Sequence, residues 1–120
     1  MHELGIVMNV IHMITQDASS RGFRRVKSVE LEVGEFSGAL PHALKEAFRI
    51  AAEGTLLDGA TLVIDEVQAE LCCKDCGRTF FPGKQGWNCP YCGAGGADLI
   101  RGMELQVKSY IGEAEECQSK

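Results

Sequence analysis

Two pairs of cysteines in the second half of the chain restrict its structure more than any other feature. Each pair has the spacing Cys-x-x-Cys followed by glycine, in Cys73–Gly77 and again in Cys89–Gly93. Thiolates two residues apart on a tight turn can share one metal ion, and a second such turn completes a tetrahedron of sulfurs. Glycine after the second cysteine permits the positive φ of such a turn. The spacing therefore predicts one metal site with the ligands Cys73, Cys76, Cys89 and Cys92.

Zinc and iron both suit four thiolates, and zinc is the better match. Zinc would be structural, with closed coordination and no redox chemistry. Iron would make an electron carrier, and Cys89–Gly93 resembles half of a rubredoxin site, but this chain is much longer and places few aromatic residues nearby. Two disulfides are a third interpretation, which the paired spacing disfavours. Metal binding can supply an apparent folding free energy of about 10–16 kcal/mol, and this stretch needs it because its large apolar residues are few.

The composition limits the classes of function. The chain has 120 residues, enough for one modest domain or a small domain with a metal-bound module, and 45% of them are hydrophobic. Its formal net charge of −5 disfavours a general binder of the nucleic-acid backbone. No stretch is long and apolar enough to span a membrane, and no basic-then-apolar leader begins the chain. We therefore expect a cytoplasmic protein.

Hydrophobic periodicity predicts two helices and three strands. The helices lie between Leu4 and about Ser20 and between Pro41 and Gly54, where apolar residues recur at three- and four-residue steps. The strands cover residues 26–34, 61–71 and 102–111, where apolar and polar residues alternate. The last two strands could pair antiparallel, as a long hairpin with the metal site at its tip. The predicted fold is α+β, with two helices packed on a small three-stranded sheet and an inserted zinc-ribbon-like module of four cysteines.

The first three residues, Met1-His2-Glu3, form a second candidate metal site. On composition alone, a disordered start with a stray histidine is the simpler interpretation. However, a free amino terminus, the amide nitrogen of His2 and its imidazole can close adjacent chelate rings on one cation, and the amide nitrogen of Glu3 completes a square. Four nitrogens in a square suit Ni(II) or Cu(II) and not Zn(II). The carboxylate of Glu3 could be a further ligand or could accept a hydrogen bond beside the site.

Together the two candidate sites resemble the HypA family of nickel-insertion accessory proteins in NiFe-hydrogenase maturation. The resemblance rests on Met1-His2-Glu3-Leu4 opening an amphipathic helix, Cys73-x-x-Cys76-Gly77, Cys89-Pro90-x-Cys92, a strand ending Val33-Gly34, and Gly102-Met103-Glu104-Leu105. It implies a nickel metallochaperone rather than an enzyme, with nickel at Met1, His2 and Glu3. A separate structural zinc would be held by Cys73, Cys76, Cys89 and Cys92. It also implies delivery to the hydrogenase large subunit, and in some organisms to urease, with the GTPase partner HypB.

On this interpretation the chain has three parts. Residues 1–71 and 97–114 form a discontinuous nickel-binding α/β domain, residues 72–96 form the zinc-binding module, and residues 115–120 form a flexible tail. The sequence leaves a homodimer open. The alternative function is a zinc-ribbon module that binds protein or nucleic acid, with nucleic acid contacted through Lys74, Arg78 and Lys84.

The remaining candidate side chains are expected to bind no metal. Cys72 should be packed or free, because strand alternation points it away from Cys73, and Cys117 should be an exposed free thiol. Met8 should fill the core of the first helix, with His12 partly buried beside it. The sequence offers no Ser/His/Asp or Cys/His arrangement for a nucleophile and no Gly-Lys-Ser/Thr loop for a phosphate. No catalytic residue is therefore predicted.

Overall fold

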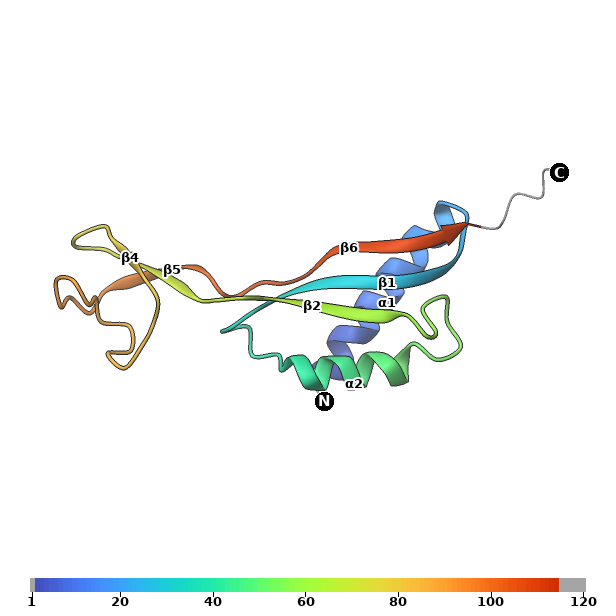
Figure 1. The fold of residues 1–120 in the computed structure, drawn as a ribbon, viewed down its shortest axis with the longest axis horizontal. Coiled ribbons are helices and arrows are strands. Elements are labelled where there is room, and N and C mark those ends of the chain that lie inside the picture. Colours follow the sequence, from blue (N-terminus) through green and yellow to red (C-terminus); the bar gives the residue numbers. More distant parts are fainter. Residues whose placement is uncertain (1, 115–120) are drawn as a thin grey trace. The chain divides into compact units, whose positions relative to one another are not determined.

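The computed structural model describes residues 2–114, and Figure 1 shows their course. The chain folds as two compact units. The helical unit contains the residues up to Leu31, Ala39–Asp65 and the chain from Gln106 onward, and the cysteine unit contains Glu32–Gly38 and Glu66–Leu105. The predicted division into a nickel-binding domain and a zinc-binding module over residues 72–96 stays a prediction. The predicted tail at residues 115–120, with Cys117, lies outside the described residues.

Helix α1 spans His2–Ser20 and so begins earlier than the sequence predicts. Apolar side chains at three- and four-residue steps share one side of a helix, and this side is buried. Its members are Val7, Val10, Ile11, Ile14 and Ala18. The helix ends at the predicted place, where the N–H of Gly22 donates to the carbonyl of Ser19 at 3.1 Å.

Three strands form one sheet in the order β2-β1-β6. They are β1 (Phe23–Gly34), β2 (Thr61–Val67) and β6 (Leu105–Ala114). Because β1 lies between β2 and β6, the predicted direct pairing of the last two strands is wrong for this sheet (Figure 1). Within the helical unit Lys108 links the strands, with its Nζ 3.7 Å from the carboxylate of Glu30 and 3.3 Å from that of Asp65.

Helix α2 spans Pro41–Ala51, with its proline in the first turn as predicted. It buries Leu44 and Phe48, which are at most 2% exposed. These side chains belong to the apolar core of the helical unit, together with the buried face of α1 and with Val29 and Leu31 of β1. Among the described residues, no helix is long and apolar enough to cross a membrane.

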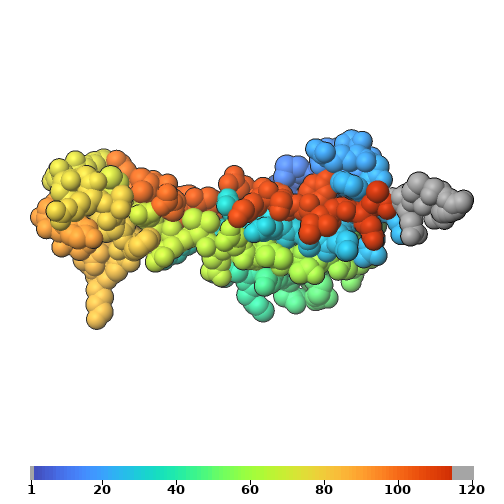
Figure 2. All heavy atoms as spheres, turned by 45° about the horizontal axis from the view of Figure 1, so that its top comes forward, coloured from blue at the N-terminus to red at the C-terminus, as the bar shows by residue number. Residues whose placement is uncertain are grey.

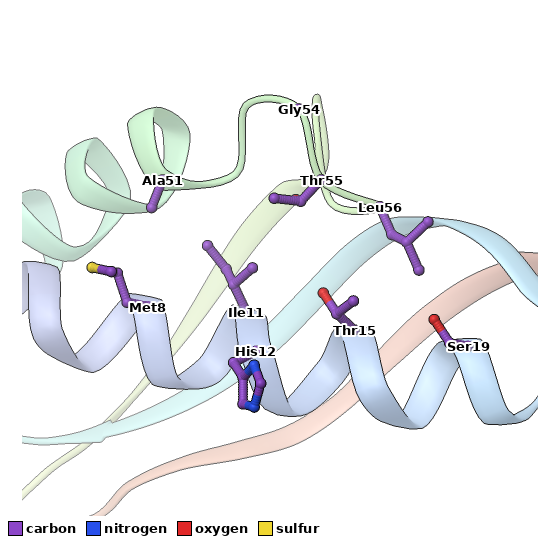
Figure 3. Close-up of a pocket in the computed structure, with 9 residues that line it drawn as sticks. All are labelled: Met8, Ile11, His12, Thr15, Ser19, Ala51, Gly54, Thr55 and Leu56. Carbon is purple, nitrogen blue, oxygen red and sulfur yellow. The ribbon is translucent and has the colours of Figure 1, made fainter.

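A groove of about 610 Å³ lies between α1 and the turn that follows α2 (Figure 3). Met8 and His12 line its α1 side, and Ala51 and Leu56 line the other. Both α1 residues are exposed, and Met8 keeps 55% of its accessible surface. The predicted burial of Met8 and His12 is therefore wrong. They lie on the flank of the apolar stripe of α1, where they line the open groove.

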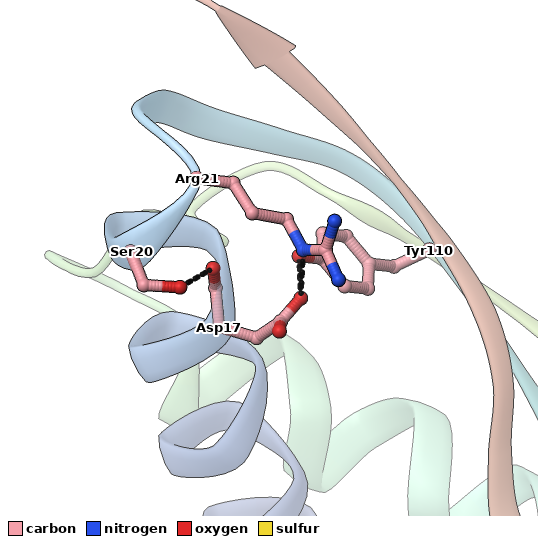
Figure 4. Close-up of polar contacts among 4 residues, drawn as sticks. All are labelled: Asp17, Ser20, Arg21 and Tyr110. Atoms are coloured by element: carbon pink, nitrogen blue, oxygen red, sulfur yellow. Dashed lines mark hydrogen bonds and ion pairs between the residues drawn. The ribbon is translucent and has the colours of Figure 1, made fainter.

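A polar cluster joins the end of α1 to β6 (Figure 4). The carboxylate of Asp17 accepts hydrogen bonds from the hydroxyl of Tyr110 and, at 2.9 Å, from Nε of Arg21. The bond from Tyr110 is the main reason that the pKa of Asp17 is lowered, and Arg21 adds to it. The ring of Tyr110 meets Phe23 edge to face at 6.3 Å. In Figure 2 the orange-red spheres of β6 accordingly lie beside the blue spheres of α1.

The cysteine unit has a sheet of its own, in the order β4-β3-β5. Its strands are β3 (Glu70–Cys73), β4 (Thr79–Phe80) and β5 (Ala97–Arg101). Leu71 of β3 lies opposite Phe80 on one side and Leu99 on the other, in antiparallel pairs. In this unit the strands on either side of the metal module therefore do pair, although β5 lies outside the predicted strands.

The predicted strand over residues 61–71 is interrupted between β2 and β3. The carboxylate of Glu35 accepts the N–H of Ala69 at 2.8 Å, so this N–H does not join a sheet. Ala69 is fully buried. A contact from Glu35, which is distant in the sequence, thus divides what the alternating pattern indicates as one strand.

Two glycines of the cysteine unit lie at close backbone approaches. Gly102 has a φ of 121°, and a β-carbon there would come within 2.6 Å of the Cα of Ala69. A β-carbon on Gly34 would overlap the backbone of Gly102. The N–H of Gly102 donates to the side chain of Glu104 at 2.8 Å. Because Gly102 takes this special conformation, the last strand begins at Leu105 and not at Gly102 as predicted.

Candidate metal centres

The two Cys-x-x-Cys pairs form two similar turns. The N–H of Gly77 donates to the carbonyl of Cys73 at 3.0 Å, and the N–H of Gly93 donates to the carbonyl of Cys89 at 2.9 Å. Both glycines have positive φ, 77° and 80°. Each turn therefore reverses the chain just after its second cysteine, which directs both sulfurs of a pair to one side.

Backbone N–H groups inside these turns point at the sulfurs. The N–H of Cys76 lies 3.5 Å from Sγ of Cys73, and the N–H of Tyr91 lies 3.4 Å from Sγ of Cys89. In both turns a backbone N–H therefore faces the sulfur of the first cysteine, which fixes the position of that sulfur.

The four sulfurs are grouped at the spacing of a tetrahedral site. Sγ of Cys73 lies 3.6 Å from Sγ of Cys92, and Sγ of Cys76 lies 3.7 Å from Sγ of Cys89. All four lie within 4.8 Å of one another. A tetrahedron with Zn–S bonds of about 2.3 Å separates its sulfurs by about 3.8 Å. The donor set and its spacing therefore fit zinc.

The cluster makes a cation electrostatically favourable. Burial opposes ionisation of Cys89, but N–H groups of Cys92 and Tyr91 and the neighbouring thiols outweigh it and lower the pKa of Cys89 to about 7. The N–H of Ala94 favours the thiolate of Cys92, but Cys73, burial and the other two cysteines raise the pKa of Cys92 to about 12. Four adjacent thiolates repel one another, so a divalent cation must displace the remaining protons as it binds.

Cys72 lies outside this cluster. Its Sγ is 3.7 Å from the carbonyl oxygen of Gly77, and its side chain is partly buried. Alternation along β3 separates it from the neighbouring Cys73, which is 1% exposed. Among residues 2–114, the cluster of four cysteines is the one group of three or more His, Cys, Asp or Glu side chains spaced to hold a metal ion.

The loop between the cysteine pairs is fixed by aromatic contacts. Trp87 stacks on Phe36 with ring centroids 5.8 Å apart and planes inclined by 7°. The guanidinium of Arg78 lies 5.0 Å from the ring centroid of Tyr91. Stacked rings and cation–π pairs of this kind stabilise a loop with little apolar core.

The amino-terminal candidate site is described from His2 onward, and Met1 lies outside the described residues. The side chain of His2 is 58% exposed at the first position of α1, and that of Glu3 is 19% exposed. Nδ1 of His2 lies 3.9 Å from the carboxylate of Glu3. Sequence analysis did not identify the other partner of this carboxylate, the N–H of Leu40, 3.2 Å away. No sequence pattern marks a backbone group 37 residues distant.

The carboxyl group of Glu3 is held in its charged form. Its pKa is lowered, first because the N–H of Leu40 donates to it and next because of its own backbone N–H, with the charge of His2 adding to the effect. A carboxylate in this position can bind a backbone donor or a cation.

Comparison with known proteins covers almost the whole chain. A family model described as "HypA: Hydrogenase/urease nickel incorporation, metallochaperone, hypA" matches residues 1–111. The chain belongs to the HypA family. It is therefore a nickel metallochaperone of hydrogenase and urease maturation, and HypA proteins are not catalysts, as the sequence predicted. This function replaces the rubredoxin-like carrier and the nucleic-acid module considered above.

Individual HypA proteins extend the likeness to sequence and fold. The hydrogenase maturation factor HypA of Geotalea uraniireducens is 43% identical over 108 residues, covering 90% of this chain and 96% of that protein. HypA of Streptomyces avermitilis is 40% identical over 111 residues, covering 91% and 85%. The solution structure of the Ni metallochaperone HypA from Helicobacter pylori has 25% identity and a TM-score of 0.65, covering 94% and 98%. Another HypA solution structure has 27% identity and a TM-score of 0.72, covering 96% and 98%.

Proposed function

We propose that the chain carries Ni(II) at its amino terminus, bound by the amine of Met1, the amide nitrogens of His2 and Glu3, and the imidazole of His2. The observation that carries the proposal is the start of α1 at His2. The first N–H groups of an α-helix have no acceptor within that helix. The amides of His2 and Glu3 can therefore lose their protons to a metal without breaking a helical hydrogen bond. The exposed imidazole lies at the same helix end.

Release follows from the same chemistry. The amine, amide and imidazole nitrogens must all be deprotonated to bind nickel, so protonation or exchange with an acceptor's ligands frees the cargo. The family description, nickel incorporation into hydrogenase and urease, supports these two enzymes as recipients. The hydrogenase large subunit as acceptor and the GTPase HypB as partner stay predictions. A cytoplasmic location, and the absence of membrane and nucleic-acid partners, stay predictions.

The four cysteines hold zinc in a structural role. Support comes from the tetrahedral spacing of their sulfurs, all within 4.8 Å of one another, and from the chemistry of four thiols. Zinc there would supply closed coordination and folding free energy, with no redox chemistry. The cysteine residues themselves shape the two turns through the backbone bonds to Gly77 and Gly93.

Equilibrium dialysis of Ni(II) with the untagged full-length chain tests the proposal. The native protein should bind about one nickel tightly, and His2→Ala should lose this binding while keeping its zinc. His12→Ala is the matched control, because His12 is also an exposed histidine of α1. It should bind nickel like the native protein. Nickel binding that survives His2→Ala, or that is lost equally in His12→Ala, would contradict a site at the amino terminus.

A further inference from the structure

The carboxylate of Glu3 connects the start of α1 to the start of α2. Its Oε2 accepts the N–H of Leu40 at 3.2 Å, across 37 residues of sequence. Both residues belong to the helical unit. In Figure 1 the start of α1 accordingly lies close to α2. The carboxylate therefore lies where the positive end of the α2 dipole would favour a negative charge.

The start of α2 lacks the side chain that usually stabilises such a position. Leu40 is its N-cap residue, has no side-chain capping hydrogen bond, and precedes Pro41 in the first turn. Serine, threonine, aspartate or asparagine would normally supply an oxygen here, and leucine cannot. The first hydrogen bond of the helix runs from the N–H of the buried Leu44 to the carbonyl of this cap residue, at 2.9 Å. Glu3 accepts the N–H of Leu40 itself and so does not replace this cap, but it places a negatively charged oxygen at the start of α2.

This contact also restrains the first turn of α1. A helix end frays unless contacts hold it. Here the side chain of Glu3, the second residue of α1, is held by the backbone of Leu40, which restrains the backbone of the first turn. His2 itself is 58% exposed, and its imidazole lies 3.9 Å from the carboxylate of Glu3. The restraint on His2 therefore passes through Glu3.

We propose that Glu3 is a positioning residue, whose carboxylate binds Leu40 and so fixes the nickel-binding end of α1, and that this carboxylate is not itself a nickel ligand. The effect on nickel affinity rests on the proposed function, whereas the contact between Glu3 and Leu40 does not. Without the tether, the imidazole and amides must be ordered at the moment of binding, which weakens affinity without changing the ligand set. Because Glu3 contacts Leu40, tight nickel binding would also require the start of α2 to be ordered.

The first test needs no nickel. Amide hydrogen exchange of Leu40 is measured by NMR in the native protein and in Glu3→Ala, Glu3→Gln and Glu46→Ala. Exchange should accelerate about tenfold in Glu3→Ala and less in Glu3→Gln, which keeps an acceptor oxygen. Glu46→Ala is the matched control, because it removes an exposed carboxylate of α2 that pairs with Arg49. It should leave Leu40 unchanged. Equal exchange in the native protein and Glu3→Ala would overturn the tether.

The second test uses nickel titration and the visible absorption of the Ni(II)-loaded chains. Glu3→Ala should weaken affinity about tenfold, with Glu3→Gln between it and the native protein, and all three should show the same absorption band. A shifted band, or complete loss of nickel in Glu3→Ala, would make the carboxylate a ligand and overturn the proposal. If the proposed nickel site itself were wrong, His2→Ala would bind nickel like the native protein. The hydrogen exchange of Leu40 would still test the contact between Glu3 and Leu40 in that case.

Discussion

The helical unit and the cysteine unit are stabilised by different means. The helical unit buries apolar side chains from α1, α2 and the sheet, with Leu31 and Leu44 fully buried. The main buried cluster of the cysteine unit consists of Leu71, Cys73, Phe80 and Cys89. Two of these four residues, Cys73 and Cys89, are candidate metal ligands. We therefore expect one unit to depend on the hydrophobic effect, and the other on metal coordination around a very small core.

Metal removal should give the largest effect and separate the two units most clearly. Chelation, or Cys73→Ser, should unfold the cysteine unit, because structural zinc contributes an apparent folding free energy of about 10–16 kcal/mol. Trp87 is the only tryptophan and stacks on Phe36 in this unit, so its fluorescence reports the loss. NMR signals of the α1 amides should stay dispersed, because α1 has its own core.

Cys72→Ser is the matched control for this experiment. It changes the neighbouring thiol of the same strand, which lies outside the cluster. Zinc content and Trp87 fluorescence should remain at native values. If chelation left the Trp87 signal untouched, the contrast between the units would fail, and the cysteine unit would have to be stabilised by its apolar residues.

A core substitution in α2 should have the next largest effect, on the other unit. Leu44→Ala should lower the free energy of unfolding of the helical unit by about 2–5 kcal/mol, because Leu44 is fully buried. Urea unfolding followed by far-ultraviolet circular dichroism measures this change. Ile50→Ala on the same helix removes a side chain that is 56% exposed and should change stability little. If Leu44→Ala lost its zinc together with its helical circular dichroism signal, the two units would not fold independently.

The smallest expected effect concerns the polar cluster at the end of α1. The pKa of Asp17 is lowered in the folded chain, chiefly by the bond from Tyr110. Its contribution to stability is therefore present above the ordinary aspartate pKa of about 3.9 and is lost as pH falls through the lower folded value. Asp17→Asn should remove this part of the acid dependence of unfolding in the helical unit. Parallel stability curves for Asp17→Asn and the native chain, measured below pH about 5, would contradict it.

The features that the sequence predicted are those encoded by neighbouring residues. The apolar residues that predict α1 recur within a single helix. Each Cys-x-x-Cys-Gly turn closes through a hydrogen bond between residues four apart, such as Gly77 and Cys73. The two-helix α+β fold and the grouping of four cysteines could be inferred from such local patterns.

The features that it missed depend on distant partners. β1 enters between β2 and β6, although an alternating pattern specifies a strand without naming its neighbours. The break before β3 depends on Glu35, and the partner of Glu3 is a backbone N–H at Leu40, where any residue except proline would present the same donor. Neither contact can therefore be predicted from the residues that neighbour it in the sequence.

The contact between Gly34 and Gly102 has a consequence for reading mutational surveys of this chain. A saturation library scored for hydrogenase maturation would lose nearly every variant at both positions, since a β-carbon on Gly34 overlaps the backbone of Gly102 and one on Gly102 meets Ala69. That depletion would match the depletion at the four cysteines, yet neither glycine offers a ligand atom. Intolerance to substitution at these two positions would therefore report a lack of space between two stretches of main chain, and a map of the metal centres drawn from such scores would be too large.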